Sequence, residues 1–113
     1  MRVLVCGGRD YQEGVVNALF RLEEEHGTFT EVVHGGARGV DTEAGVFARL
    51  RLAKEIIYRA NWKLHGKSAG PRRNQKMLEE TKPKLVIAFP GGKGTAHMKK
   101  LAKAEGYTVI EAK

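Results

Sequence analysis

The chain has 113 residues, the size of one domain, and 42% of them are hydrophobic, so we expect a single domain with its own core over residues 1–113. No apolar run approaches the roughly 20 residues that cross a bilayer, and the one cysteine excludes an intramolecular disulfide and a cysteine-cluster metal site. A formal net charge of +7 favours anionic partners, which are nucleotides, nucleic acids or acidic surfaces.

Residues 2–6 predict the first strand because they form a short apolar run. The sequence starts directly with this strand and has no signal-peptide pattern, so we expect a cytoplasmic protein with no membrane partner. The strand ends in the glycine turn Gly7–Tyr11, and apolar periodicity then predicts a helix over about 12–26.

The rest of the chain continues this alternation. Further strands are predicted at 31–34, 55–58, 85–89 and 107–110. Further helices are predicted at about 40–54, 71–81 and 96–106, with an irregular segment at 59–70. Strands that alternate with helices indicate an α/β fold with a doubly wound parallel sheet in three layers.

Glycine turns follow the first, second and fourth predicted strands. Ligands of a doubly wound sheet bind beyond the carboxyl ends of the strands, at the point where the strand order reverses. We therefore predict five strands in the order 3-2-1-4-5, because this order places the three turns side by side.

The turn Pro90–Thr95 is the strongest candidate for an anion site. It follows the buried run Leu85–Phe89, and Pro90 stops the strand because it has no N–H to donate. Three glycines let the backbone approach a ligand, and the helix that follows directs free N–H groups and its positive dipole end to the same place. The other interpretation is a tight connection that binds nothing.

Four arginines lie beside a glycine turn or at a predicted helix start: Arg9, Arg38, Arg72 and Arg73. A guanidinium group binds phosphate in a bidentate manner, so each is a candidate phosphate contact. The alternative is a surface arginine or the partner of a nearby carboxylate. Arg73 is expected to hold a phosphate and to matter little for the stability of the free protein.

Other polar side chains have two interpretations each. Asp10 and Asp41 could accept ribose hydroxyls or orient an arginine, and Asp41 is also a candidate for helix capping. Trp62 either stacks on a base or belongs to the core. His65 is either a general base or a solvated loop residue.

Four segments carry a resemblance to a known family: Gly7–Tyr11, Val33–Asp41, Ala69–Asn74 and Pro90–Thr95, in that order. Together they resemble the SLOG superfamily, and within it the small stand-alone branch related to YspA and cpYpsA. The second segment is also similar to the glycine-arginine-glycine stretch of DprA, the DNA-processing protein. The last is similar to the PGG-x-GT turn of LOG-type nucleotide phosphoribohydrolases.

The resemblance implies a Rossmann-like domain that binds a nucleotide or a nucleotide-derived ligand. The residues expected to bind it are Gly7, Gly8, Arg9, Asp10, Gly35, Gly36, Arg38, Gly39, Asp41, Arg72, Arg73, Asn74, Gly91, Gly92, Lys93, Gly94 and Thr95.

The resemblance to LOG-type enzymes is incomplete at the catalytic position. Those enzymes carry an acidic residue after the PGG-x-GT turn, whereas Ala96, His97 and Met98 follow it here. We therefore expect slow or absent cleavage of adenosine monophosphate. Three residues are retained as candidates for a catalytic role, Asp10, Arg73 and Glu79.

Three functions remain open. The first is the binding of a nucleotide or nucleotide-derived signal by a sensor or sequestering module. The second is a LOG-type enzyme that cleaves an N-glycosidic bond of a nucleotide, and the third is a DNA-binding protein. We expect no cofactor and no metal, and a homo-oligomer is one possible state.

Overall fold

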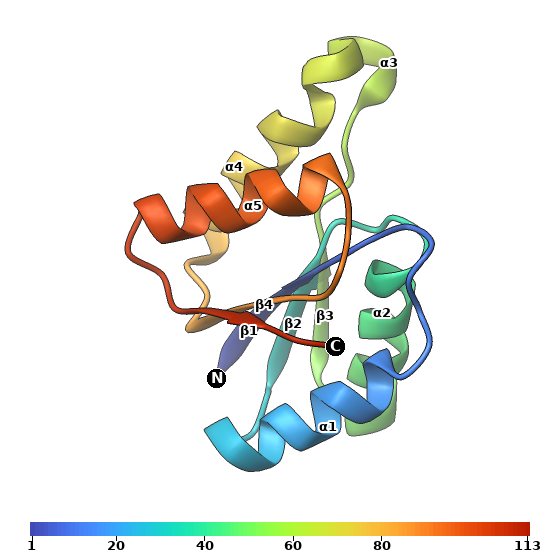
Figure 1. Cartoon of the computed structure of the whole chain (residues 1–113), viewed down its shortest axis with the longest axis vertical. Helices are drawn as coiled ribbons and strands as arrows, with labels where there is room; N and C mark the ends of the chain where they lie inside the picture. Colours follow the sequence, from blue (N-terminus) through green and yellow to red (C-terminus); the bar gives the residue numbers. More distant parts are fainter.

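The computed structural model describes residues 1–113 as a five-stranded sheet between two pairs of helices (Figure 1). The strands are β1 Arg2–Cys6, β2 Glu31–His34, β3 Lys54–Ile57, β4 Leu85–Ala88 and β5 Val109–Glu111. The helices are α1 Val15–His26, α2 Val40–Arg51, α3 Trp62–His65, α4 Ala69–Thr81 and α5 Lys93–Ala104, with the 3₁₀ turn η1 Gly66–Ser68 before α4. None of these helices has the length and apolar character that crossing a membrane requires.

The sheet is parallel throughout, in the order β3-β2-β1-β4-β5, which confirms the predicted Rossmann-like topology. β1 lies at the centre, where Leu4 is in register with Val33 of β2 and with Val86 of β4. The turns that follow these three strands therefore leave the sheet at neighbouring positions of one edge.

Alternate residues of β1 supply two separate cores. Val3 and Val5 pack with α1 and α2, whereas Leu4 and Cys6 pack with α4 and α5. Figure 1 shows the two helix pairs on opposite faces of the sheet. Burial on both faces explains why the central strands appear in the sequence as uninterrupted apolar runs.

Helices α1 and α2 are shorter than predicted, while the strand boundaries agree within two residues. α1 begins at Val15, after Gly14 has taken a left-handed conformation. α2 ends at Arg51 because Leu52 has a left-handed φ of 56°, which ends the run of helical dihedral angles.

In the second half of the chain, two helices begin at other residues than the sequence predicts. The segment 59–70, predicted to be irregular, contains α3 and η1, and α4 begins at Ala69. Pro71 is its third residue, a place that tolerates proline because N–H groups of the first turn have no helical acceptor. α5 begins at Lys93 rather than after Thr95, so part of the glycine turn forms the first turn of the helix.

The fold leaves least room at Gly7, directly after β1. A Cβ at this position would lie 2.5 Å from Cγ2 of Val40 and 3.0 Å from Cβ of Phe89, and both neighbours are buried. We predict that Gly7→Ala lowers the free energy of unfolding by about 1–3 kcal/mol, the usual effect of overpacking a core. Urea unfolding followed by circular dichroism measures this change.

Gly94→Ala is the matched control. A Cβ at Gly94 meets no atom within 4 Å, and the residue lies in α5. Alanine is favoured over glycine in a helix by about 0.5–1 kcal/mol, so this variant should be as stable as the wild type or more stable. Equal stability of Gly7→Ala and the wild type would contradict the close packing at the β1 exit.

Candidate functional site

A cavity of about 670 Å³ lies beyond the carboxyl ends of β1, β2 and β4. Its walls come from the three glycine turns, from the first turns of α4 and α5, and from Trp62 of α3. We call it the main cavity. Most of the predicted ligand-binding residues line it: Gly7, Gly8, Arg9, Asp10, Gly35, Asp41, Arg73, Asn74, Gly92, Lys93, Gly94 and Thr95.

The other predicted site residues lie elsewhere. Gly36 and Arg38 line a smaller hollow beside the main cavity. Arg72 is exposed, and its Nε donates a hydrogen bond to Oγ of Ser68 (3.0 Å). Glu79 is also exposed and accepts a hydrogen bond from Gln75 on the same helix (3.0 Å), so this catalytic candidate is not part of the cavity wall.

The three glycine turns are joined to one another through Gly8. Its N–H donates to the carbonyl oxygen of Pro90 (2.9 Å), and its own carbonyl oxygen accepts the N–H of Val40 (3.2 Å). Gly39 has a φ of 78°, and a Cβ there would collide with the backbone oxygens of Gly8 and Arg9. Gly91 likewise packs against the N–H of Gly8. Gly39 and Gly91, which the sequence predicts as ligand-binding residues, therefore allow the turns to pack closely against one another.

Asp41 holds the turn after β2 in place. Its Oδ2 accepts hydrogen bonds from the N–H groups of Gly35 and Ala37 (3.2 Å each), and the side chain is buried. Burial raises the pKa of Asp41 above its ordinary value, although the N–H of Ala37, His34 and Arg73 oppose this shift. The carboxylate is thus occupied by the turn before α2. Its donors belong to this turn and not to the helix, so Asp41 forms no helix cap.

Arg73 and Asn74 connect α4 to the turns. Nη1 of Arg73 donates to the carbonyl oxygens of Gly35 (2.8 Å) and Tyr58 (3.2 Å), and its Nε donates to Oδ1 of Asn74 (3.0 Å). Nδ2 of Asn74 donates to the carbonyl oxygen of Gly94 (3.2 Å). Burial lowers the pKa of Arg73 from its ordinary value, with Arg9 adding to the shift and Asp41 opposing it.

The main cavity has more cationic than anionic side chains. Arg9, Lys67, Arg73 and Lys93 line it, against the carboxylates of Asp10 and Asp41. Asp10 forms an ion pair with Arg38 (3.1 Å), but it is 91% exposed and is therefore weakly held.

Cys6 also reaches the cavity wall. Burial raises the pKa of its thiol to about 12, so the group stays protonated at neutral pH and is a poor nucleophile.

Several lining residues have no role in the sequence prediction, among them Lys67 and His97. Nδ1 of His97 lies 3.2 Å from Nδ2 of Asn74, one turn into α5. The sequence could have indicated His97, because it follows Lys93 by four residues in α5 and so lies on the same face of that helix. Lys67 gives no such signal, since only the folding of 59–70 brings it to the cavity.

Trp62 is a wall of the cavity rather than a core residue. Its side chain is 50% exposed, and the guanidinium carbon of Arg9 lies 5.5 Å from the ring centroid, within the range of a cation–π interaction. The edge of its six-membered ring faces Gly70 of α4, where a Cβ would lie 3.2 Å from Cη2 of Trp62. Because half of Trp62 is exposed, the predicted base-stacking position is open to solvent. His65 does not line the cavity.

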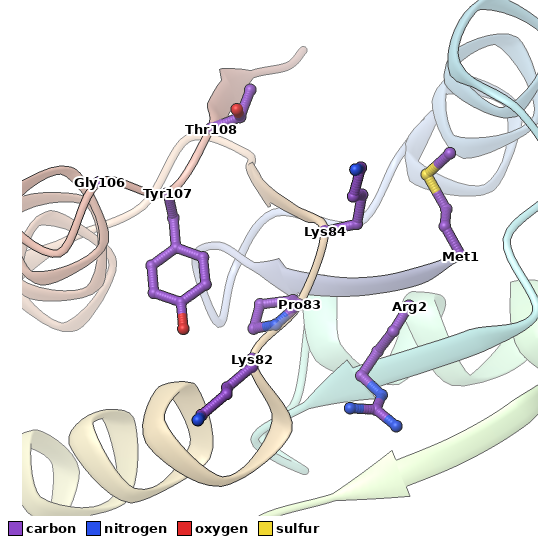
Figure 2. Close-up of a pocket in the computed structure, with 8 residues that line it drawn as sticks. All are labelled: Met1, Arg2, Lys82, Pro83, Lys84, Gly106, Tyr107 and Thr108. Atoms are coloured by element: carbon purple, nitrogen blue, oxygen red, sulfur yellow. The ribbon is translucent and has the colours of Figure 1, made fainter.

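Another hollow, of about 440 Å³, lies at the opposite edge of the sheet (Figure 2). Arg2 is fixed there by Glu31 (3.1 Å) and by the carbonyl oxygen of Thr81. Figure 2 shows that the side chains of Lys82 and Lys84 point away from one another. Because its cations do not converge, this hollow is a weaker candidate than the main cavity for binding an anion.

Residues 1–65 match the family described as YspA, cpYpsA-related SLOG. The chain is 34% identical to the Gene 61 protein of Mycobacterium phage D29, in an alignment of 119 residues that covers 96% of this chain and 94% of that protein. No solved structure gives a significant match. The family match includes the turns after β1 and β2 and ends before the turn after β4.

Asp41 provides a test of how the site is held together. Asp41→Ala leaves the N–H groups of Gly35 and Ala37 without their acceptor, and each unsatisfied buried donor costs about 1–3 kcal/mol. Asp41→Asn is the matched control, because it keeps an oxygen acceptor. We predict that the alanine variant is destabilised by at least about 1 kcal/mol relative to the asparagine variant, measured by urea unfolding at pH 7.

The wild type and Asp41→Asn also show how the ionisation of Asp41 affects stability. The pKa of Asp41 is higher in the folded chain than its ordinary value of 3.8, so the folded state binds the proton more tightly. The contribution of Asp41 to stability therefore falls as pH rises from the ordinary value through the raised one, and is constant above it. Asp41→Asn should lack this loss of stability as pH rises above 3.8. Identical pH profiles for Asp41→Asn and the wild type would contradict the raised pKa.

Proposed function

The chain belongs to the YspA, cpYpsA-related SLOG family, and on that premise we propose that its main cavity binds a nucleotide or a nucleotide-derived ligand, as a sensor or sequestering module. One observation carries the proposal. The amino terminus of α5 and three glycine turns open into the same basic cavity, at the strand-order reversal of a parallel sheet.

The start of α5 is suited to a phosphate group. Gly92, Lys93, Gly94 and Thr95 all line the cavity, and the first turn of α5 has no acidic residue. N–H groups of a first helical turn have no acceptor within the helix, and the helix dipole favours an anion beside them. The Lys93 side chain is exposed and forms no ion pair, so it is available to the ligand.

The rest of the cavity offers partners for a nucleoside. Trp62 presents half of its surface to solvent, and stacking of a base on an aromatic ring contributes about 1–3 kcal/mol. Asn74 and His97 provide polar groups on the α4 and α5 side. A phosphate at α5 and a base at Trp62 would together span the cavity.

Binding without turnover is the favoured form of this function. The three residues directly after Thr95 carry no carboxylate, and Asp41 already accepts two backbone N–H groups. Asp10 is exposed and paired with Arg38. Neither carboxylate of the cavity wall is free and shielded in the way that a general acid at neutral pH requires.

Arg73 lies near the start of α4 and lines the cavity, as the sequence predicts, but it is held by the backbone. Its two hydrogen bonds to backbone carbonyls give it a structural task, so Arg73→Ala should destabilise the free protein. Loss of ligand binding in that variant would not separate a phosphate contact from a disrupted site. Lys93 is the better residue for a binding test.

We predict that Lys93→Ala raises the dissociation constant for a nucleoside 5′-monophosphate about 10-fold or more, since a hydrogen bond to a charged group contributes about 1.5–3 kcal/mol. Isothermal titration calorimetry with the four common monophosphates measures the effect. Lys100→Ala is the control, because Lys100 is an exposed lysine of the same helix outside the cavity. The free energy of unfolding of both variants should lie within about 0.5 kcal/mol of the wild-type value.

The outcomes distinguish the three functions. Equal affinities of Lys93→Ala and Lys100→Ala would place the nucleotide elsewhere. Absence of mononucleotide binding together with strongly salt-dependent DNA binding would replace the proposal by the DNA-binding alternative.

Incubation with adenosine monophosphate provides a separate test of turnover. We predict no release of adenine above the uncatalysed background, because the acidic group expected of a LOG-type enzyme is absent and such groups contribute about 10²–10⁴-fold. Chromatography of the products measures this. Turnover near 1–10 per second would establish an enzyme, and Asp10→Asn and Asp41→Asn would then show which carboxylate serves it.

A further inference from the structure

A smaller hollow of about 360 Å³ lies beside the main cavity, at the exits of β2 and β3. Four of its nine lining residues are arginines, Arg9, Arg38, Arg59 and Arg73, and none is an aspartate or glutamate. We call it the arginine hollow. The two spaces are continuous, because Arg9, Gly35, Ala37, Trp62 and Arg73 line both.

The arginines of this hollow are held mainly by neutral groups. Nη1 of Arg59 donates to the carbonyl oxygen of Gly36 (3.0 Å), and Arg73 donates to two backbone carbonyls. Arg9 lies over the ring of Trp62. Only Arg38 has a carboxylate partner, Asp10, in a pair whose side chains are 74% and 91% exposed.

Like charges held together in this way favour an anion between them. Each guanidinium still has free N–H donors, because a guanidinium carries five. The protein uses one of them in Arg38, one in Arg59 and three in Arg73, and none in Arg9. Phosphate is the anion whose geometry suits paired guanidinium donors. Inorganic anions and phosphate esters share this chemistry, so the position of the hollow decides which one fits.

The arginine hollow lies at the exit of β2 and the amino terminus of α5 lies at the exit of β4, with β1 between these two strands. Neighbouring strands lie about 4.8 Å apart, so the exits of β2 and β4 on either side of β1 are about 10 Å apart. Two adjacent phosphates of a diphosphate are too close together to occupy both places. Phosphates on two different hydroxyls of a nucleoside, or at the two ends of a dinucleotide, lie farther apart than those of a diphosphate and come closer to this spacing. Trp62 lines both spaces.

We propose that the site takes a nucleotide ligand with two separate phosphate groups, one at the amino terminus of α5 and one in the arginine hollow, with a nucleoside between them. This inference rests on the proposed nucleotide function and specifies its ligand class. Arg59 is the residue by which the second phosphate position can be tested, because it lines the arginine hollow and not the main cavity.

The test compares four probes on the full-length protein: adenosine 5′-monophosphate, adenosine 5′-diphosphate, adenosine 3′,5′-bisphosphate and a diadenylate phosphorylated at both ends. Trp62 is the only tryptophan, so its fluorescence reports on the shared wall directly, and calorimetry confirms each affinity. A probe with separated phosphates should bind about 10- to 150-fold more tightly than the monophosphate. The diphosphate, whose phosphates are adjacent, should lack this gain.

Arg59→Ala should remove most of the gain and leave the affinity for the monophosphate unchanged. Arg21→Ala is the matched control, because Arg21 is exposed on α1 and forms no side-chain hydrogen bond or ion pair. It removes the same charge and should leave all affinities as in the wild type. Thermal melts verify that both variants are folded.

Each outcome has a distinct meaning. Equal affinities of the wild type for the monophosphate and for both separated-phosphate probes would overturn the second phosphate position and leave the proposed function standing. A gain that Arg59→Ala and Arg21→Ala reduce equally would show a general charge effect and would also overturn it. Failure of every probe to bind would overturn the proposed nucleotide function and this inference together.

Discussion

The contact of three backbone turns around Gly8 is the constraint on which the rest of this structure depends. Gly8 donates to Pro90 and accepts from Val40, so the exit of the central strand is clamped between its two neighbours. Side chains would separate these turns, and glycine at Gly7, Gly39 and Gly91 leaves the necessary room. The cavity exists because its three walls are fixed to one another by the backbone, before any ligand contact is made.

Electrostatics then decide which class of ligand the cavity would favour. Positive side chains outnumber carboxylates along its wall, and one of its two carboxylates is occupied by the turn that it supports. The adjoining arginine hollow continues the same imbalance without any acidic residue. A cavity with backbone-joined walls, helix N–H groups without a helical acceptor and excess positive charge favours an anion such as phosphate and offers little acid–base chemistry.

Two polar residues illustrate how far sequence pattern reaches into such a site. Asp41 follows a glycine turn and Arg73 lies at a predicted helix start, so both are recognisable as special, and both line the cavity. Their hydrogen bonds nevertheless go to the backbone of the turn after β2, where they hold it between α2 and α4. A charged residue beside a glycine turn or at a helix start is equally compatible with binding a ligand and with fixing a turn. Only the positions of the donors and acceptors distinguish the two.

The sequence alone determined the topology and the edge of the sheet that carries the cavity. Buried strands leave continuous apolar runs, glycine turns mark their exits, and these local patterns allow one strand order that brings the turns together. Only the tertiary structure decided the contributions of 59–70. The fold of this segment brings Arg59, Trp62 and Lys67 to the walls of the two hollows. These placements depend on contacts between segments far apart in the chain, and no periodicity of the sequence records such contacts.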